Sequence, residues 1–322
     1  MYKSLKGWHV LPLVLLALLA ACARSPVLPA ESALLPERVE LTEVPFFAQS
    51  DYQCGPAALA TMLSQRGVAT SPGLLKDRVY IPGREGSLQV EMVAAARAHE
   101  LLVYPLQPHL ADLLKEVAAG NPVLVLQNLA FDWYPRWHFA VLVGYDRRDG
   151  SLILRSGITR RWLTDFASFD TTWARSGRWA VVTLPGDRLP AGAQLRPWLK
   201  AASDLEETGH SRVAQQAYLT ATERWPAESL GWFALANSRY AAGDRTGAEA
   251  ALRVSIERAP SFAAGWFNLA QVLAERGCEA AAKEVGACAR RLAPADKRFA
   301  PVQVKSDQAA GQCLPPPACP QP

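Results

Sequence analysis

The sequence QSDYQCGPAALATML spans residues 49–63 and places a cysteine directly before Gly-Pro at the start of an apolar run. Apolar residues recur at helical spacing in this run, which predicts a helix over about 54–66. Pro56 suits the first turn of that helix, where its missing N–H costs nothing. Cys54 is then expected at the helix N-terminus, where the positive end of the helix dipole lowers the pKa of a thiol and favours the nucleophilic thiolate.

Two other side chains are candidates to act with Cys54. Gln49 lies upstream, within reach of an oxyanion position beside the Cys54 backbone N–H. His138 opens the strand-like run HFAVLVGYD, where its ring can face a cleft at a sheet edge. A cysteine on an early helix and a histidine on a later strand are typical of cysteine peptidases. Plainer interpretations stay open: Cys54 as an inert helix-start residue, His138 as a structural histidine, and Gln49 as a turn cap with Gln53 as its rival.

The elements around this pair predict an α+β domain over residues 45–186. Two further helices are expected, followed by antiparallel strands, one pair of which carries hairpin turn signals in GYDRRDGSLIL. The expected helices cover 87–101 and 110–120, and the expected strands 101–106, 122–128, 138–146, 151–157 and 178–185. Trp133, Tyr134 and Trp137 precede or flank the histidine and fit a substrate groove or core packing equally well.

The stretch VPFFAQSDYQCGPAALATML, followed by HFAVLVGYD, resembles the bacteriocin-processing peptidases, the papain-like cysteine family thirty-nine. These enzymes clip leader peptides after a Gly-Gly pair. The resemblance covers about residues 45–186 and implies a papain-like fold. It also implies Cys54 as nucleophile, His138 as general base and acid, and Gln49 as oxyanion donor.

The chain departs from the family pattern at the residue that orients the histidine. Family members usually carry an Asp-Pro after the histidine strand, and the matching position here falls on Ser156-Gly157. A serine can hydrogen-bond a histidine but cannot stabilise imidazolium by charge, so Ser156 is expected to support a weaker Cys–His pair. Asp146 is a possible substitute, although the resemblance places it in a turn. Family members also usually belong to an export transporter, whereas no ATPase or transporter sequence is recognisable here, so an envelope protein is the expected substrate.

The N-terminus predicts a bacterial lipoprotein. Residues 1–21 combine two lysines, a short apolar run and small residues, as in a secretory signal peptide. Cys22 follows Leu-Ala-Ala, which resembles the lipobox and implies lipidation of Cys22; a plain signal peptide is the alternative. Ala23 in the next position favours the outer membrane, facing the periplasm. Residues 22–44 are Pro-rich and are expected to form a tether.

Composition bounds the remaining functions. The 322 residues are enough for two domains, and half of them are apolar, so a sizeable core is expected. The net charge of +4 is small and not concentrated in one block, which argues against a nucleic-acid partner. Neither CxxC nor HExxH spacing occurs, so no metal site and no cofactor are expected.

After a linker over 187–194, residues 195–296 carry a 34-residue period. A period of 34 with Trp near the start, small residues inside and a closing Pro resembles the tetratricopeptide repeat, a pair of helices. Three repeats are about the minimum that buries a continuous core, and we expect them to bind a protein partner or the substrate. The recurring residues are Trp198, Trp232 and Trp266; Gly209, Gly243 and Gly277; Ala214, Ala248 and Ala282; and Pro226, Pro260 and Pro294.

The tail over 297–322 contains Cys313 and Cys319 and has little means of holding itself in place. Cys278 and Cys288 are expected on one helix, roughly 15 Å apart, which is too far for a disulfide between them. The tail is therefore expected to fold back and pair its two cysteines with these two. A local Cys313–Cys319 loop is the competing interpretation.

Together these patterns predict an α+β papain-like cysteine peptidase domain followed by an all-α tetratricopeptide-repeat domain. The expected function is a membrane-anchored periplasmic cysteine peptidase that cleaves a peptide or protein of the cell envelope. The main alternative is a catalytically degenerate, peptidase-like scaffold that binds peptides and organises an envelope complex. A third possibility keeps the reactive thiol but transfers acyl groups to an amine instead of water.

Overall fold

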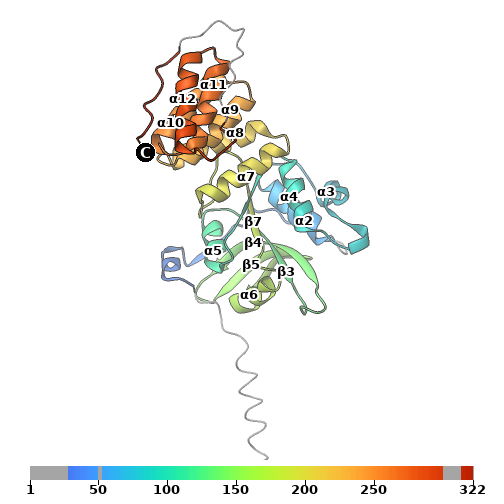
Figure 1. The fold of residues 1–322 in the computed structure, drawn as a ribbon. Helices are drawn as coiled ribbons and strands as arrows, with labels where there is room; N and C mark the ends of the chain where they lie inside the picture. The colour runs from blue at the N-terminus through green and yellow to red at the C-terminus, as the bar shows by residue number, and fades with distance from the viewer. Residues whose placement is uncertain (1–27, 50–52, 300–312, 322) are drawn as a thin grey trace, which may run out of the picture. The chain divides into compact units, whose positions relative to one another are not determined.

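The computed structural model describes residues 28–49, 53–299 and 313–321 (Figure 1). The predicted signal peptide and Cys22 lie outside these residues. Within the described part of the chain, no helix has both the length and the apolar character needed to cross a membrane. The chain divides into two compact units. The first comprises the described residues up to His99 with Pro105–Thr183 and Pro190–Gly192, and the second comprises Glu100–Tyr104, Leu184–Leu189 and the chain from Ala193 onward.

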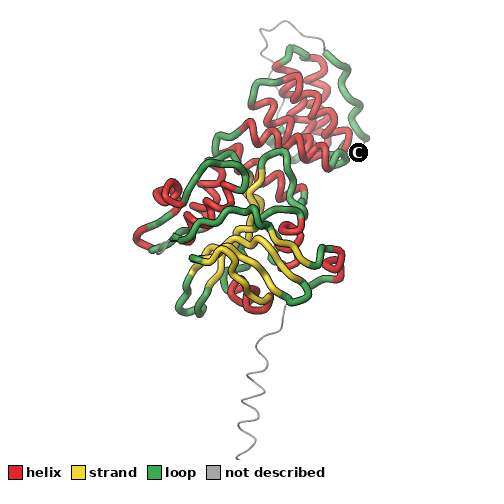
Figure 2. The backbone as a smooth tube through the Cα atoms, turned by 180° about the vertical axis from the view of Figure 1, so that it is seen from behind, coloured by secondary structure: helices red, strands yellow, loops and turns green. Residues whose placement is uncertain are grey.

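The chain forms a seven-stranded sheet in the order β2-β7-β3-β4-β5-β6, with β1 paired to β4; all strands except β2 lie wholly or mainly in the first unit and form its core. Figure 2 shows these strands, in yellow, as one twisted layer. Adjacent pairs from β7 through β3, β4 and β5 to β6 are antiparallel. The strands are β1 Arg38–Glu40, β2 Leu102–Pro105, β3 Val123–Asn128, β4 Trp137–Asp146, β5 Ser151–Ser156, β6 Thr159–Asp165 and β7 Ala180–Leu184.

One buried helix, α2, dominates the packing on this sheet. Every residue from Gly55 to Leu63 is buried, and α2 contacts β3, β4 and β5. A helix that is apolar all round belongs in a core, which is why the run that begins at Cys54 has no polar face. The other helices of the unit are α3 Pro72–Val79, α4 Gln89–Arg97, α5 Leu110–Ala118 and α6 Phe166–Ala174, with 3₁₀ turns η1 Ala30–Leu34 and η2 Pro82–Arg84; α2 itself spans Cys54–Ser64.

The prediction that residues 22–44 form only a tether is wrong for its last part. β1 pairs with the end of β4, where Arg38 faces Asp146 and Glu40 faces Gly144. β4 is longer than its partner β3, whose pairing ends at Leu142, so β1 supplies hydrogen bonds that the overhanging residues would otherwise lack. A Cβ at Gly144 would lie 2.7 Å from the Val39 carbonyl oxygen, so the close approach of β1 requires glycine there.

Three helix pairs make up the rest of the second unit and confirm the 34-residue period. The first helices of the pairs begin at Leu195, Ser229 and Ala263, and each is followed by a second helix in the same register. The turn glycines Gly209, Gly243 and Gly277 have φ values of 92°, 83° and 78°, a region that favours glycine. The assignment of these pairs as tetratricopeptide repeats stays a prediction. The helices are α7 Leu195–Glu207, α8 Ser211–Arg224, α9 Ser229–Ala241, α10 Arg245–Arg258, α11 Ala263–Glu275 and α12 Glu279–Leu292.

The C-terminal tail folds back on the last repeats, as predicted. Disulfides join Cys278 to Cys313 and Cys288 to Cys319, each with a Cα–Cα distance of 5.7 Å. The competing Cys313–Cys319 loop is therefore wrong. Cys278 and Cys288 are buried in the apolar core of the last two pairs, and Cys319 packs against it.

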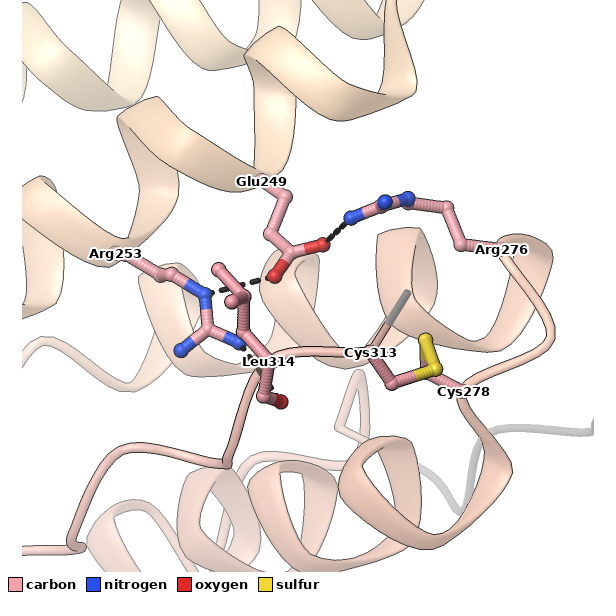
Figure 3. Close-up of a disulfide and its surroundings, with 6 residues drawn as sticks. All are labelled: Glu249, Arg253, Arg276, Cys278, Cys313 and Leu314. Carbon is pink, nitrogen blue, oxygen red and sulfur yellow. Dashed lines mark hydrogen bonds and ion pairs between the residues drawn. A yellow bond between two sulfur atoms is a disulfide. The ribbon is translucent and has the colours of Figure 1, made fainter. Parts of the chain in front are cut away.

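Hydrogen bonds fix the tail between its disulfides (Figure 3). Arg253 donates to the carbonyl oxygens of Leu314, at 3.4 Å, and Pro315, at 2.9 Å. The same guanidinium donates to the Glu249 carboxylate, which is 2% exposed and also accepts from Arg276. The buried carboxylate is therefore paired, and its contact with Arg253 orients the arginine that holds the tail.

The second disulfide is expected to stabilise the repeat unit by restricting its unfolded chain. Its cysteines are 31 residues apart, a separation for which loop-closure entropy gives about 3–4 kcal/mol. We expect Cys288→Ser combined with Cys319→Ser to lower the free energy of unfolding by about that amount. Urea denaturation under oxidising conditions measures it. Cys278→Ser with Cys313→Ser is the matched comparison, because its separation of 35 residues predicts a similar loss. An unchanged midpoint in both double variants contradicts the prediction.

Candidate active site

Cys54 is the first residue of α2 and opens onto a cleft. The residue before it, Gln53, is the N-cap and makes no side-chain capping hydrogen bond. The backbone N–H groups of Phe139, Gly55 and Cys54 itself lie near the sulfur and favour its thiolate form. Because Phe139 directly follows His138 in β4, the sulfur lies against the strand that carries the candidate base. In the described part of the chain, Cys54 is the free cysteine.

Burial, not the helix terminus, dominates the protonation of Cys54. Desolvation raises the pKa of the thiol, and the three backbone hydrogen bonds that favour the thiolate only partly oppose it. The expectation of a thiol pKa lowered by the helix N-terminus is therefore wrong. The resting sulfur is a protonated thiol, and its proton must be removed when it reacts.

His138 is partly buried near the start of β4, and one ring nitrogen already has a partner. Its Nε2 lies 2.8 Å from Ser156 Oγ. Desolvation lowers the pKa of His138 to about 4, so the ring is neutral at neutral pH. Gln127 lies opposite His138 on β3, but its amide donates to Thr172 Oγ1 at 2.7 Å. With Nε2 facing Ser156, Nδ1 is the nitrogen that remains to accept a proton from a thiol.

The strand register explains why Ser156 reaches the histidine. β5 pairs with β4 so that Val141 faces Arg155. In this register Ser156 lies opposite the β4 residue two positions after His138, so the two side chains lie on the same face of the sheet. The proposed substitute Asp146 lies eight residues away at the other end of β4, and its carboxylate accepts from the Arg148 backbone N–H at 3.0 Å. Asp146 therefore belongs to the turn and cannot orient the imidazole.

Gln49, Cys54 and His138 line one cleft of about 800 Å³. The Gln49 backbone N–H donates to the Gly157 carbonyl oxygen at 3.2 Å, which ties the segment before α2 to the residue after Ser156. Gln53, the rival candidate, does not line the cleft. The fold thus brings together Gln49, Cys54 and His138 around a cavity, with Ser156 supporting the histidine. The cleft is lined by Gln49, Cys54, Arg84–Leu88 and Tyr134–Phe139.

The β3–β4 loop provides aromatic side chains at the cleft. The sequence alone did not decide whether these side chains line a groove or pack in the core. Tyr134 and Trp137 line the cleft and are 66% and 53% exposed, which favours the groove. Buried Asn128 holds the loop: its Oδ1 accepts from the backbone N–H groups of Ala130, at 3.1 Å, and Arg136, at 2.9 Å. Sequence reasoning missed Asn128, although a polar residue at the end of an apolar strand run is a recognisable signal.

Arg155 is a second support that the sequence did not reveal. It is 5% exposed, and its guanidinium donates to the carbonyl oxygens of Val44, Leu41 and Arg160, at 2.7–3.3 Å. Desolvation lowers the pKa of this buried group, which is held by neutral carbonyl acceptors. Arg155 fixes the segment that leads to Gln49 beside the strand that carries Ser156.

No group of three or more His, Cys, Asp or Glu side chains that could hold a metal ion occurs among the described residues. The chemistry that the cleft can perform with its own side chains is nucleophilic attack by sulfur with an imidazole as proton acceptor.

Residues 41–181 match the model of the Peptidase_C39 like family. A search of curated proteins finds no match.

Three solved structures are similar to less than half of this chain. A putative C39-like peptidase from Bacillus anthracis is 19% identical over 46% of this chain and 98% of its own, with a TM-score of 0.39. A double glycine motif protease from an AMS/PCAT transporter, in complex with the leader peptide, is 18% identical over 44% and 91%, with a TM-score of 0.33. The peptidase domain of Streptococcus ComA, a bi-functional ABC transporter involved in a quorum sensing pathway, is 17% identical over 44% and 99%, with a TM-score of 0.34.

The lowered pKa of His138 predicts the acid limit of Cys54 reactivity. A lowered pKa means that the neutral base persists until the pH falls to about 4, well below the ordinary histidine value. We expect the rate of Cys54 alkylation by iodoacetamide, followed by mass spectrometry of the Cys54 peptide, to fall with a midpoint near pH 4. His138→Ala should abolish this decrease in rate near pH 4 and leave a rate that rises only as the thiol ionises at alkaline pH. A wild-type midpoint near 6.5, or identical profiles, contradicts the assignment.

Replacing Ser156 tests its contact with the histidine. Ser156→Asp places a negative charge beside Nε2, which stabilises imidazolium. The midpoint of the decrease in alkylation rate at acid pH should therefore rise by about 1–3 pH units. Ser156→Ala removes one neutral hydrogen bond and should slow alkylation at neutral pH by roughly 3- to 10-fold. Ser151→Ala, at the other end of β5, is the control and should behave as wild type. If Ser156→Ala matches that control, Ser156 does not orient His138.

Proposed function

Because residues 41–181 match the model of the Peptidase_C39 like family, we propose that this chain is a cysteine peptidase in which Cys54 and His138 hydrolyse a peptide bond. The observation that carries the proposal is the cleft that Gln49, Cys54 and His138 line together. The 2.8 Å contact between Ser156 Oγ and His138 Nε2 adds the third member that orients the base.

The reaction starts from a neutral thiol and a neutral imidazole. His138 Nδ1 takes the proton from Cys54 Sγ as the sulfur forms a bond to the substrate carbonyl carbon. The carbonyl oxygen becomes an oxyanion, which accepts hydrogen bonds from the Cys54 backbone N–H and the Gln49 side-chain amide. The imidazolium keeps its Nε2–H directed at Ser156 Oγ, which accepts that hydrogen bond without carrying a charge.

The tetrahedral intermediate then collapses. The C–N bond breaks, and His138 gives its proton to the leaving amine, which departs as the new N-terminus of the product. Water attacks the remaining thioester while His138 takes one of its protons, and the C–S bond breaks. The acyl part leaves as a carboxylic acid, and the proton returns to the sulfur to restore the resting thiol.

The substrate is proposed to be a peptide or protein of the bacterial cell envelope. The signal peptide and lipobox in residues 1–22 support a lipoprotein attached through Cys22 to the outer membrane and facing the periplasm. The repeats are proposed to recruit the substrate or a protein partner. A groove of about 410 Å³ between helices of the first two pairs supports this role, with Arg196, Lys200, Tyr218, Phe233 and Asn237 among its lining residues.

A second candidate function is a peptidase-like scaffold that binds peptides without cleaving them. Ser156 stands where the family resemblance places an aspartate, and burial disfavours the charged forms of both Cys54 and His138. These features lower the reactivity of the pair. Acyl transfer to an amine differs from hydrolysis only in the acceptor and leaves the same thioester.

Comparison of envelope-protein N-termini tests the proposed function. In cells with the wild-type protein we expect new N-termini that disappear in Cys54→Ala and His138→Ala cells, because both groups are required for attack. Gln49→Ala should reduce them roughly 100-fold or more, as loss of an oxyanion donor does. Gln53→Ala is the matched control, since Gln53 does not line the cleft. Identical N-termini in wild-type and Cys54→Ala cells reject the peptidase and favour the scaffold.

A further inference from the structure

We propose that the Ser87 hydroxyl is a substrate-positioning group that hydrogen-bonds the main chain of the residue supplying the scissile carbonyl. The inference rests on the proposed function and assigns a role to a residue outside the Cys–His–Gln set. It concerns binding of the acyl part of the substrate, not the chemistry of the sulfur.

Ser87 lies on the segment between η2 and α4 and lines the same cleft as Cys54 and His138. Its hydroxyl lies against the first turn of α2. A Cβ at Gly55 would come within 2.1 Å of Ser87 Oγ and 2.5 Å of Ser87 Cβ. Glycine is therefore required directly after the nucleophile, because Ser87 occupies the space where a side chain would lie.

The hydroxyl has no hydrogen-bond partner although its oxygen is buried. A buried polar group without a partner destabilises the fold, and such groups in native proteins call for an explanation. Packing does not supply one, because the Ser87 Cβ already lies against Gly55, and alanine would keep that atom without the unpaired oxygen. The hydroxyl is thus retained beside the nucleophile at the expense of stability, as expected for a group that acts when the cleft is occupied.

The chemistry of a hydroxyl indicates what it recognises. It is uncharged and both donates and accepts, so it suits a peptide N–H or C=O and not a charged side chain. A staggered turn about its Cα–Cβ bond moves Oγ away from Gly55. The substrate residue attacked by Cys54 must place its carbonyl carbon at the sulfur, and Ser87 lies against Gly55, the residue that directly follows Cys54. The main chain of that substrate residue is therefore the part of the substrate nearest to Ser87.

A buried, unpartnered hydroxyl elsewhere in the molecule provides a matched control. Ser238 in α9 is 3% exposed, and its Oγ is also buried without a partner. It lies in the repeat unit and does not line the repeat groove. Ser87→Ala and Ser238→Ala therefore make the same chemical change, and only the first makes it at the cleft.

The test compares acylation of Cys54 by two activated esters in the purified full-length protein. In both reactions an S–C bond forms, the ester C–O bond breaks and p-nitrophenolate leaves. The p-nitrophenyl ester of N-acetylglycine carries an amide beside its acyl carbon, whereas p-nitrophenyl acetate has none. We expect Ser87→Ala to slow acylation by the first ester about 10-fold and by the second less than 2-fold.

Two further measurements make the test specific. Both alanine variants should unfold at the same urea midpoint as wild type or a higher one, because each loses an unpaired buried oxygen. Ser238→Ala should leave both acylation rates unchanged. Equal slowing of the two esters by Ser87→Ala, or no slowing of either, overturns the positioning role while leaving the peptidase proposal intact. Absence of Cys54-dependent acylation in the wild-type protein overturns both.

Discussion

The packing of α2 against β3, β4 and β5 is the constraint on which the site depends. Every residue from Gly55 to Leu63 is buried, so the helix cannot slide or tilt without opening the core. Its first residue is therefore fixed beside β4, and the Phe139 N–H contact with the Cys54 sulfur is a direct result. A nucleophile held by a core helix needs no further anchor of its own.

The same burial that fixes the pair also opposes its ionisation. It raises the pKa of Cys54 and lowers that of His138, so both groups rest neutral. A carboxylate beside Nε2 would offset the cost of imidazolium by charge, whereas Ser156 offers only a neutral hydrogen bond. The resulting site holds its geometry through hydrogen bonds, and proton transfer must accompany attack instead of preceding it. This is why the low pKa of His138 is compatible with its proposed role as a base.

Short sequence patterns were sufficient to predict the elements that carry the residues of the site. The Cys-Gly-Pro start predicted α2, and the apolar run after His138 predicted β4. The position of Ser156 in the strand after the histidine strand predicted its contact with His138, and its hydroxyl lies beside the imidazole. The antiparallel sheet and the all-helical C-terminal region confirm the predicted fold class. What failed depends on tertiary contacts. β1 forms because β4 overhangs β3, and β6 is an exposed edge strand without an apolar pattern. The direction of the thiol pKa depends on burial, which the helix-start signal does not encode.

The unsatisfied groups of the resting cleft have a common explanation. Cys54 keeps a proton that burial prevents it from losing, and Ser87 keeps a hydroxyl that lacks a partner. The buried supports of the cleft, Arg155 and Asn128, both find backbone partners. Other buried hydroxyls without a partner, those of Ser32, Tyr145, Thr183 and Ser238, lie away from the cleft. Among these unpaired hydroxyls of the described residues, that of Ser87 belongs to a residue that lines the cleft, where a ligand can supply the missing partner. A substrate that supplies this partner gains a hydrogen bond without displacing an existing one, so its binding energy can serve to complete the site.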